Sequence, residues 1–361
     1  MAASLVALRH LKGEWDFLVN VEVASVYTFF VLSAFLLTLR SLEVLPPRRD
    51  GQAAFWGRYA LKRFFRVYPL YLLGTLALLG ATLVYPALAS FLERDHGGFS
   101  FVGQASMVRP LRTLFWAIPL EMESYLVIPW IVLLAARWPW PAALACTAVA
   151  GLWSLARDPA ATLYHPHLLS GALLPVFLAG SASAIIVHRI RVHRGADLPT
   201  RWAERVLSAV AGRTSTYLAV LAVMVLLTPE FRSLVPGPGL LGERTYRTMP
   251  VLLPAACLCA IIVMGTLTTR PDDALIRVFS TPLLERAGEI SYSIYLTHPV
   301  AIGVVWAVHT RWEGLPAAVE VGLFALTAYA VASLTFAAVE RPVIAFGDRL
   351  AHPLAVAAGA R

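Results

Sequence analysis

A succession of apolar segments, each of roughly 20 residues, constrains the fold of this chain more than any other feature. A helix rises about 1.5 Å per residue, so each segment can cross a hydrocarbon core about 30 Å thick. Lipid offers no partner for unpaired backbone groups, so the segments are expected to be helices. They lie at about 23–40, 69–92, 112–136, 139–156, 167–189, 215–235, 250–269, 290–309 and 316–337. A shorter apolar stub at 1–18 brings the count to ten.

Composition agrees with a membrane protein. The 361 residues are 58% hydrophobic and 14% charged, whereas soluble domains are nearer half apolar and a quarter charged. We therefore predict an all-α integral membrane protein, a bundle of about ten transmembrane helices whose first helix is truncated. Residues 1–345 are assigned to this transmembrane domain and residues 346–361 to a short cytoplasmic tail.

Loop charge predicts the orientation. The loops at 40–66 and 189–213 are rich in Arg, and such loops stay in the cytoplasm. Alternating spans then put both termini in the cytoplasm of a multi-pass cell-membrane protein. The net charge of +8 is explained by these loops, so no nucleic-acid partner is expected. No His, Cys or acidic residues have metal-site spacing, so no metal is expected.

Glu121 is the most informative residue of the segment LFWAIPLEMESYLVIP at 114–129. A carboxylate at membrane depth is costly and marks a functional site by default. Glu121 and Tyr125 are one helical turn apart and can face one cavity. Glu123 points about 200° away from Glu121 and is the weaker candidate.

His10 ends the N-terminal stub, near the outer end of the first span by parity. It is either an interfacial histidine with no task or a general base, since His titrates near neutral pH. Arg63 and Arg66 share a face of a helix start. They are either a positive-inside anchor or a clamp for the phosphates of an anionic co-substrate such as coenzyme A.

A third polar group lies in EISYSIYLTHP at 289–299. Ser291, Tyr295 and His298 form one stripe on a membrane helix, which faces either a neighbouring helix as a hydrogen-bonding seam or a wet cavity. Ser33 and Ala34 are small residues that favour close helix packing. The sequence has no phosphate-binding glycine loop, no GxSxG elbow and no dinucleotide fingerprint, so ATP hydrolysis is not expected.

Five segments in order resemble the acyltransferase 3 family of multi-span membrane acyltransferases. They are FFVLSAF at 29–35, the R-x2-R-x2-P pattern at 63–69, the W-x4-E-x3-Y pattern at 116–125, ISYSIYLTHP at 290–299, and Glu340-Arg341-Pro342. The resemblance implies transfer of an acyl group, often acetyl, from acyl-coenzyme A to a hydroxyl of a sugar, glycan, lipid-linked or natural-product acceptor.

The resemblance also implies roles for residues. His10 would be the catalytic base and Glu121 its catalytic partner, while Arg63 and Arg66 would bind acyl-coenzyme A. His10 carrying the acyl group covalently across the membrane is a variant of this scheme. The residues expected to contact substrate are Trp116, Tyr125, Ser291, Tyr295 and His298.

One family feature is absent from the chain. The family carries an Arg eleven residues before the His of its first span, with ten residues between them, and this Arg would fall two places before Met1. We expect either a start upstream of Met1 or a catalytically impaired homologue. A transporter or exporter of a small acylated molecule is the alternative from another class, although the sequence shows no repeated halves.

Overall fold

The described part of the chain is entirely helical. The computed structural model describes residues 16–46, 49–84, 100–108, 115–156, 173–193, 195, 197–210, 218–219, 222, 257–261, 277, 280–312 and 315–357. Its main elements are α2 (Asp16–Val44), α3 (Arg49–Val84), α5 (Phe101–Ala105), α6 (Ala117–Arg137), α7 (Pro139–Ala156), α8 (Leu174–Val192), α9 (Leu198–Val210), α14 (Pro282–Glu289), α15 (Ser291–His309), α16 (Ala317–Thr335), the π-helical turn η2 (Phe336–Glu340) and α17 (Arg341–Ala357). The prediction of an all-α protein is confirmed for these residues.

Six stretches are long and apolar enough to cross a membrane. They are Val26–Val44, Gly51–Val84, Ala117–Arg137, Leu174–Val192, Ser291–His309 and Ala317–Val356. All six overlap segments expected from the sequence. The count of ten spans and the truncated first span stay predictions, because 1–18, 215–235 and 250–269 lie largely outside the described residues.

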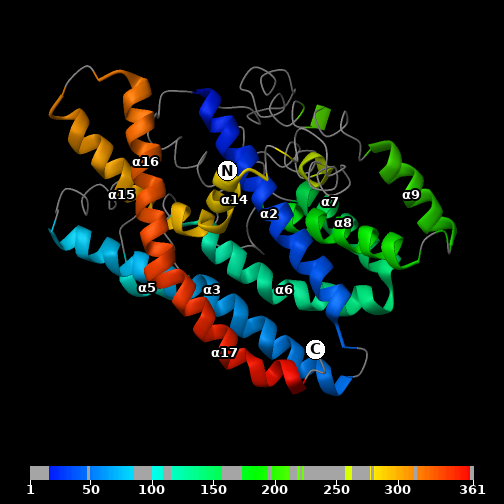
Figure 1. Cartoon of the computed structure of the whole chain (residues 1–361). Helices are drawn as coiled ribbons and strands as arrows, with labels where there is room; N and C mark the ends of the chain where they lie inside the picture. The colour runs from blue at the N-terminus through cyan, green and yellow to red at the C-terminus, as the bar shows by residue number, and fades with distance from the viewer. Residues whose placement is uncertain are drawn as a thin grey trace.

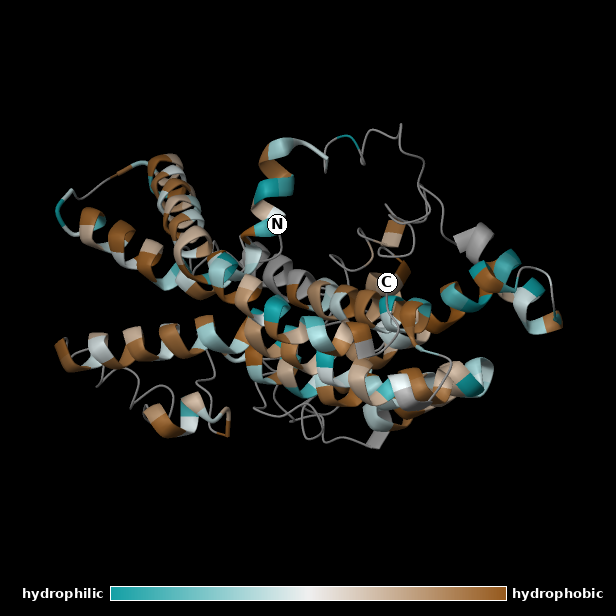
Figure 2. Cartoon of the chain, turned by 60° about the horizontal axis from the view of Figure 1, so that its bottom comes forward, coloured by the Kyte–Doolittle hydropathy of each residue, from teal (hydrophilic) through white to brown (hydrophobic). Residues whose placement is uncertain are grey.

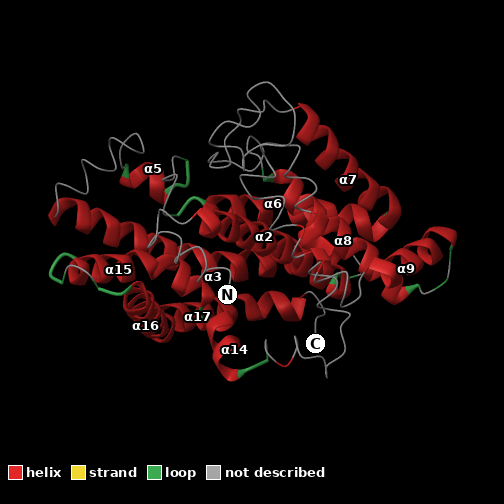
Figure 3. Ribbon diagram, turned by 90° about the horizontal axis from the view of Figure 1, so that it is seen from above, coloured by secondary structure: helices red, strands yellow, loops and turns green. Residues whose placement is uncertain are grey.

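The helices form two groups that meet at α3. Helix α2 packs against α6 and α8, and α7 packs against α8. Helices α15 and α16 form a hairpin at the opposite end, joined to the rest by α3 and α17 (Figure 1). The view from above shows the same division, with α15 and α16 at one end and α8 and α9 at the other (Figure 3).

Small residues bring α2 and α8 together. A Cβ placed on Gly180 would lie 2.5 Å from the Val31 carbonyl oxygen and 3.0 Å from Ala34 Cβ, so only glycine fits there. The hydroxyl of Thr38 donates to that of Ser181 at 3.1 Å in the same interface. The expected packing role of Ala34 is therefore confirmed, as small residues allow close helix approach in membranes.

Large apolar side chains also cover the outside of the assembly. Leu126, Trp130, Trp306 and Leu334 are each about 70% exposed. Hydrophobic residues, coloured brown in Figure 2, recur along most of the helices. Soluble proteins rarely expose so much apolar surface, so these faces fit contact with lipid.

Helix α3 is longer than the sequence predicts. It has 36 residues, about 54 Å, and so exceeds a hydrocarbon core of about 30 Å. Its first half is held by α17: Lys62 Nζ lies 2.7 Å from Asp348 Oδ1, and Gly347 packs on the ring of Phe65. The expected domain boundary at 345 falls inside α17, which extends to Ala357.

Three elements, α6, α15 and η2, meet near the middle of α3, and we call this region the junction. Helices α6 and α15 begin there, and η2 joins α16 to α17 there. Their side chains form one apolar cluster that includes Val67, Tyr71, Phe115, Tyr125 and Leu296. The starts of α6 and α15 and the π-helical turn η2 thus lie against one long helix, α3. Such π-helical turns are frequent at functional sites.

Candidate functional site

Glu121 lies in the first turns of α6, at the junction. Its side chain is buried, with 8% of the residue exposed. Its Oε1 accepts a hydrogen bond from the Tyr125 hydroxyl at 2.6 Å and another from the Ser33 hydroxyl at 3.3 Å. The spacing of Glu121 and Tyr125 therefore puts them on one face, as predicted. Glu123, in contrast, is only half-buried.

Arg63 and Arg66 reach the same region from α3. The guanidinium carbon of Arg63 lies 6.0 Å from the centre of the Tyr125 ring. Both arginines act electrostatically on the Glu121 carboxylate. Among the described residues, no carboxylate oxygen is within ion-pair distance of either guanidinium. The guanidinium groups of Arg63 and Arg66 are therefore not neutralised by a direct ion pair within the described part of the chain.

The placement of these arginines corrects one prediction. They were expected at a helix start, but α3 begins at Arg49, well before Arg63. The turns of α3 before Arg63 are helical because they pack against α17. This contact joins segments far apart in the chain, so the residues at 40–66 alone do not indicate it. The helix terminus therefore contributes nothing to an anion site here, and any attraction comes from the side chains.

Aromatic side chains surround Glu121. The rings of Tyr59 and Tyr125 meet edge to face with their centres 6.5 Å apart. The hydroxyl of Tyr292 donates to the Val67 carbonyl at 2.7 Å and joins α15 to α3. Trp116 precedes α6, is buried, and lies with its ring centre 6.3 Å from that of Phe30. Its role in binding a substrate stays a prediction.

The three polar residues predicted on α15 have different surroundings. His298 is buried, and its Nδ1–H donates to the Tyr295 carbonyl of the same helix at 2.6 Å. Tyr295 is half-buried and packs against the apolar cluster that contains Tyr125. Ser291 is half-buried at the first position of α15. The structure thus brings Tyr295 close to the junction, and the roles of all three stay predictions.

Two residues at the junction were missed as site candidates. Ser33 was assigned to packing, yet its hydroxyl donates to Glu121. Glu340, at the end of η2, is 2% exposed, and its Oε2 accepts from the Ser293 hydroxyl at 2.5 Å. The sequence signal that could have identified Glu340 as a site candidate is a carboxylate next to a long apolar segment.

His10 lies outside the described residues, so its distance from Glu121 is not defined and its role as base stays a prediction. Within the described part of the chain, no three His, Cys, Asp or Glu side chains are grouped in a way that could hold a metal ion.

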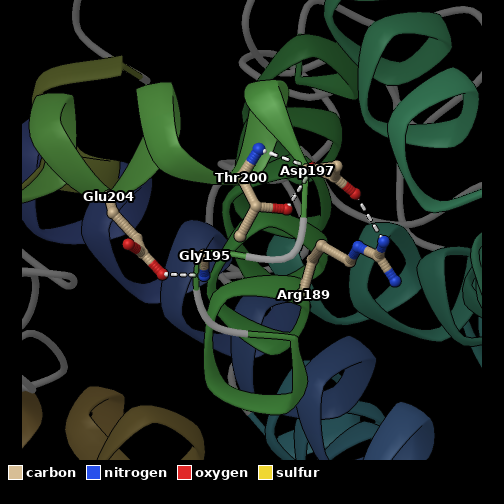
Figure 4. A network of polar contacts seen from close by, with 5 residues as sticks. All are labelled: Arg189, Gly195, Asp197, Thr200 and Glu204. Atoms are coloured by element: carbon tan, nitrogen blue, oxygen red, sulfur yellow. Dashed lines mark hydrogen bonds and ion pairs between the residues drawn. The ribbon is translucent and has the colours of Figure 1, made fainter.

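A second polar cluster lies between α8 and α9. Asp197 Oδ2 is 2.5 Å from Arg189 Nη2, and its Oδ1 accepts from the backbone N–H of Thr200 at 2.7 Å (Figure 4). Glu204 Oε1 accepts from the N–H of Gly195, whose φ of +65° favours glycine. The Thr200 and Arg189 bonds hold the pKa of Asp197 well below its ordinary value. Asp197 thus caps the N-terminus of α9, as Asp does in many helices.

Comparison with known proteins agrees with the sequence interpretation. A family described as an acyltransferase domain, acyltransferase 3, matches residues 4–339. The chain is 24% identical, over 373 aligned positions, to the peptidoglycan O-acetyltransferase OatA of Listeria monocytogenes. That alignment covers 95% of this chain and 54% of the relative, so the chain spans about half the length of OatA. No solved structure matches the chain.

The family match covers nearly the whole chain and includes the described residues of the junction up to Val339, while Glu340 is the first residue beyond the match. Glu121, Tyr125, Arg63 and Arg66, which the resemblance singled out, are the same side chains that meet around the first turns of α6. The predicted family is therefore confirmed, and the chain belongs to the acyltransferase 3 family.

Proposed function

We propose that this protein is a membrane-embedded O-acyltransferase that moves an acyl group, preferably acetyl, from acyl-coenzyme A to a hydroxyl of a sugar or glycan. The observation that carries the proposal is the buried carboxylate of Glu121, held by two hydroxyl donors beside two arginines that no described carboxylate pairs. Buried carboxylates inside membrane segments mark functional sites. The family match to an acyltransferase domain supports the same reaction class.

In the proposed reaction, His10 takes the proton of the acceptor hydroxyl as its oxygen attacks the carbonyl carbon of the thioester. The tetrahedral intermediate then breaks its carbon–sulfur bond. The coenzyme A thiolate leaves and takes the proton from the imidazolium of His10. Glu121 orients His10 and stabilises its positive charge, as a buried carboxylate does in a catalytic triad. Tyr295 or His298 donates to the oxyanion of the intermediate.

The arginines supply the donor site in this scheme. Arg63 and Arg66 bind the phosphates of acyl-coenzyme A, because a guanidinium offers a planar set of donors that matches phosphate oxygens. The positive loops at 40–66 and 189–213 support a cytoplasmic location for the first turns of α3 and for both termini. The donor would then enter from the cytoplasm, where α3 begins.

The acceptor proposal rests on the relative. OatA is named for O-acetylation of peptidoglycan, which carries sugar hydroxyls. Trp116 and Tyr125 lie at the start of α6 beside Glu121, and aromatic rings are suited to contact with a sugar. A transporter is not favoured, because the family match and the relative are both acyltransferases.

The test is transfer of labelled acetyl from acetyl-coenzyme A to peptidoglycan fragments and simple glycans by the purified protein. We expect transfer by the wild type and a fall of roughly 10²- to 10⁴-fold for His10→Ala, the usual contribution of a general base. His309→Ala is the matched control, because His309 lies at the far end of α15 and bonds Glu320. Near-normal turnover in His10→Ala would refute the base assignment. No transfer to any hydroxyl by the wild type would refute the function.

A further inference from the structure

Glu340 is the second buried carboxylate of the junction, and the proposed reaction does not use it. The π-helical turn η2 ends at Glu340 and places it where α16 passes into α17. One carboxylate oxygen, Oε2, accepts from Ser293 at 2.5 Å. The other, Oε1, is buried and has no hydrogen-bond donor among the described residues. A buried carboxylate with an unsatisfied oxygen is costly, so a nearby positive charge must compensate for it.

Arg66 is that charge. It acts electrostatically on Glu340 and on Glu121 alike. Neither carboxylate is within ion-pair distance of the guanidinium. Arg66 is thus attracted by two buried carboxylates from different helices, without being bound tightly to either.

The packing of α17 on α3 fixes this arrangement. Lys62, one turn before Arg66, pairs with Asp348 at 2.7 Å, and Phe65 lies against Gly347. A Cβ on Gly347 would lie 2.5 Å from Phe65 Cβ, so the two helices cannot shift along each other without steric cost. The distance from Arg66 to Glu340, which immediately precedes α17, is therefore set by the packing of α17 on α3.

We infer that Glu340 is a positioning residue for the acyl donor: it holds the Arg66 guanidinium away from Glu121, so that Arg66 is available to the phosphates of acyl-coenzyme A. This inference rests on the proposed function and deepens it. Without the Glu340 charge, Glu121 is the remaining buried carboxylate that attracts Arg66. The guanidinium then moves toward Glu121 and forms an ion pair, which removes its donors from the phosphate site and binds the carboxylate that His10 needs.

The direction in which the affinity for acetyl-coenzyme A changes distinguishes a positioning role of Glu340 from a purely electrostatic one. Removing a negative charge near an anion site strengthens anion binding by charge alone. The positioning role predicts the opposite: Glu340→Gln weakens the binding of acetyl-coenzyme A, by about tenfold if one charged hydrogen bond is lost. Glu340→Asp keeps the charge one methylene further back, and we expect its affinity to lie between those of Glu340→Gln and the wild type.

The experiment measures the dissociation constant of acetyl-coenzyme A by calorimetry on the purified full chain, together with the KM for the donor, kcat and the thermal midpoint of each variant. Glu320→Gln is the matched control, because Glu320 is another buried carboxylate, bonded to His309 at 2.7 Å at the far end of the α15–α16 hairpin. We expect a higher donor KM for Glu340→Gln, partial recovery in Glu340→Asp and no change in donor affinity for Glu320→Gln.

Three outcomes decide the question. Unchanged or tighter donor binding in Glu340→Gln, with the wild type binding normally, overturns the positioning role and leaves the proposed function standing. A fall in thermal midpoint with normal donor affinity shows a structural role only and overturns it as well. If the wild type does not bind acetyl-coenzyme A at all, the donor assignment fails, and the positioning role fails with it.

Discussion

The junction and the α8–α9 turn are both polar clusters built from Arg and acidic residues. They differ in how many of their charged groups have a direct ion-pair partner. In the turn, Asp197 has a direct Arg189 partner at 2.5 Å and bonds to the backbone and hydroxyl of Thr200. At the junction, Glu121 and Glu340 are buried, and neither touches a guanidinium. The charged groups of the exposed turn pair with one another, whereas the guanidinium groups of Arg63 and Arg66 have no carboxylate partner among the described residues of the junction.

From this difference we expect the α8–α9 turn to be a structural cluster and the junction to be a functional one. A fully bonded network at a helix start fixes local backbone geometry and needs nothing further. A buried site whose charges are only partly compensated is destabilising for the fold, and such strain is retained where a ligand or a reaction uses it. If the distinction holds, substitutions at the junction reduce transfer with little effect on stability, and substitutions in the turn do the reverse.

Glu121→Gln is the strongest test of the contrast. It keeps the side-chain volume and removes the charge that His10 is proposed to need, so the transfer rate is expected to fall by roughly 10²- to 10⁴-fold. The measurement is turnover of labelled acetyl-coenzyme A under saturating acceptor. Glu123→Gln, two residues along α6 and only half-buried, is the control. Equal losses in the two variants would contradict the assignment of Glu121.

Arg66→Ala comes next in expected size. Loss of a charged phosphate contact raises the KM for the acyl donor by about 10- to 100-fold. The measurement is the donor KM at fixed acceptor, with Arg191→Ala as control because Arg191 pairs with Glu43 away from the junction at 3.4 Å. A fall in kcat with an unchanged donor KM would mean that Arg66 serves the reaction and not the donor.

Tyr125→Phe removes one hydrogen bond from Glu121 without changing the packing of the ring. The hydroxyl donates to Oε1 at 2.6 Å, and a bond to a charged acceptor contributes enough to lower kcat by about tenfold. Tyr68→Phe is the matched control, since its hydroxyl donates to the Ala105 carbonyl on α5 at 3.2 Å. Normal turnover in Tyr125→Phe would show that Ser33 alone suffices to hold Glu121.

Much of the fold is predictable because lipid imposes simple rules. The segments at 112–136, 139–156, 290–309 and 316–337 all correspond to observed helices. The early start of α3 and the existence of α9 were not predicted, because both lie in charged loops whose helices depend on contacts beyond the apolar pattern. For α3 that contact is α17, and for α9 it is the cap formed by Asp197.

The site divides in a similar way. Glu121 and Tyr125 could be paired from spacing alone, since one helical turn brings them onto one face. Ser33 and Glu340 could not be joined to them, because they lie on α2 and η2 and meet α6 or α3 only through tertiary packing. A single sequence predicts which residues share one face of a helix, but it does not predict which other helix packs against that face.

Asp197→Asn, in the turn, is expected to have the smallest effect. It keeps an acceptor for Thr200 but loses the charge that pairs with Arg189, so transfer stays normal and the thermal midpoint falls by about 1–2 °C.

Because the folded state lowers the pKa of Asp197, the stabilisation is complete above the unfolded pKa and is lost as the pH falls toward the folded value. The wild type should therefore exceed Asp197→Asn by a constant margin from about pH 5 to 8 and lose that margin below about pH 4. Thermal unfolding followed by tryptophan fluorescence measures this margin, and Arg201→Gln on exposed α9 is the control. A loss of transfer in Asp197→Asn, with the midpoint unchanged, would show that the turn is also part of the functional machinery and would remove the distinction between the two clusters.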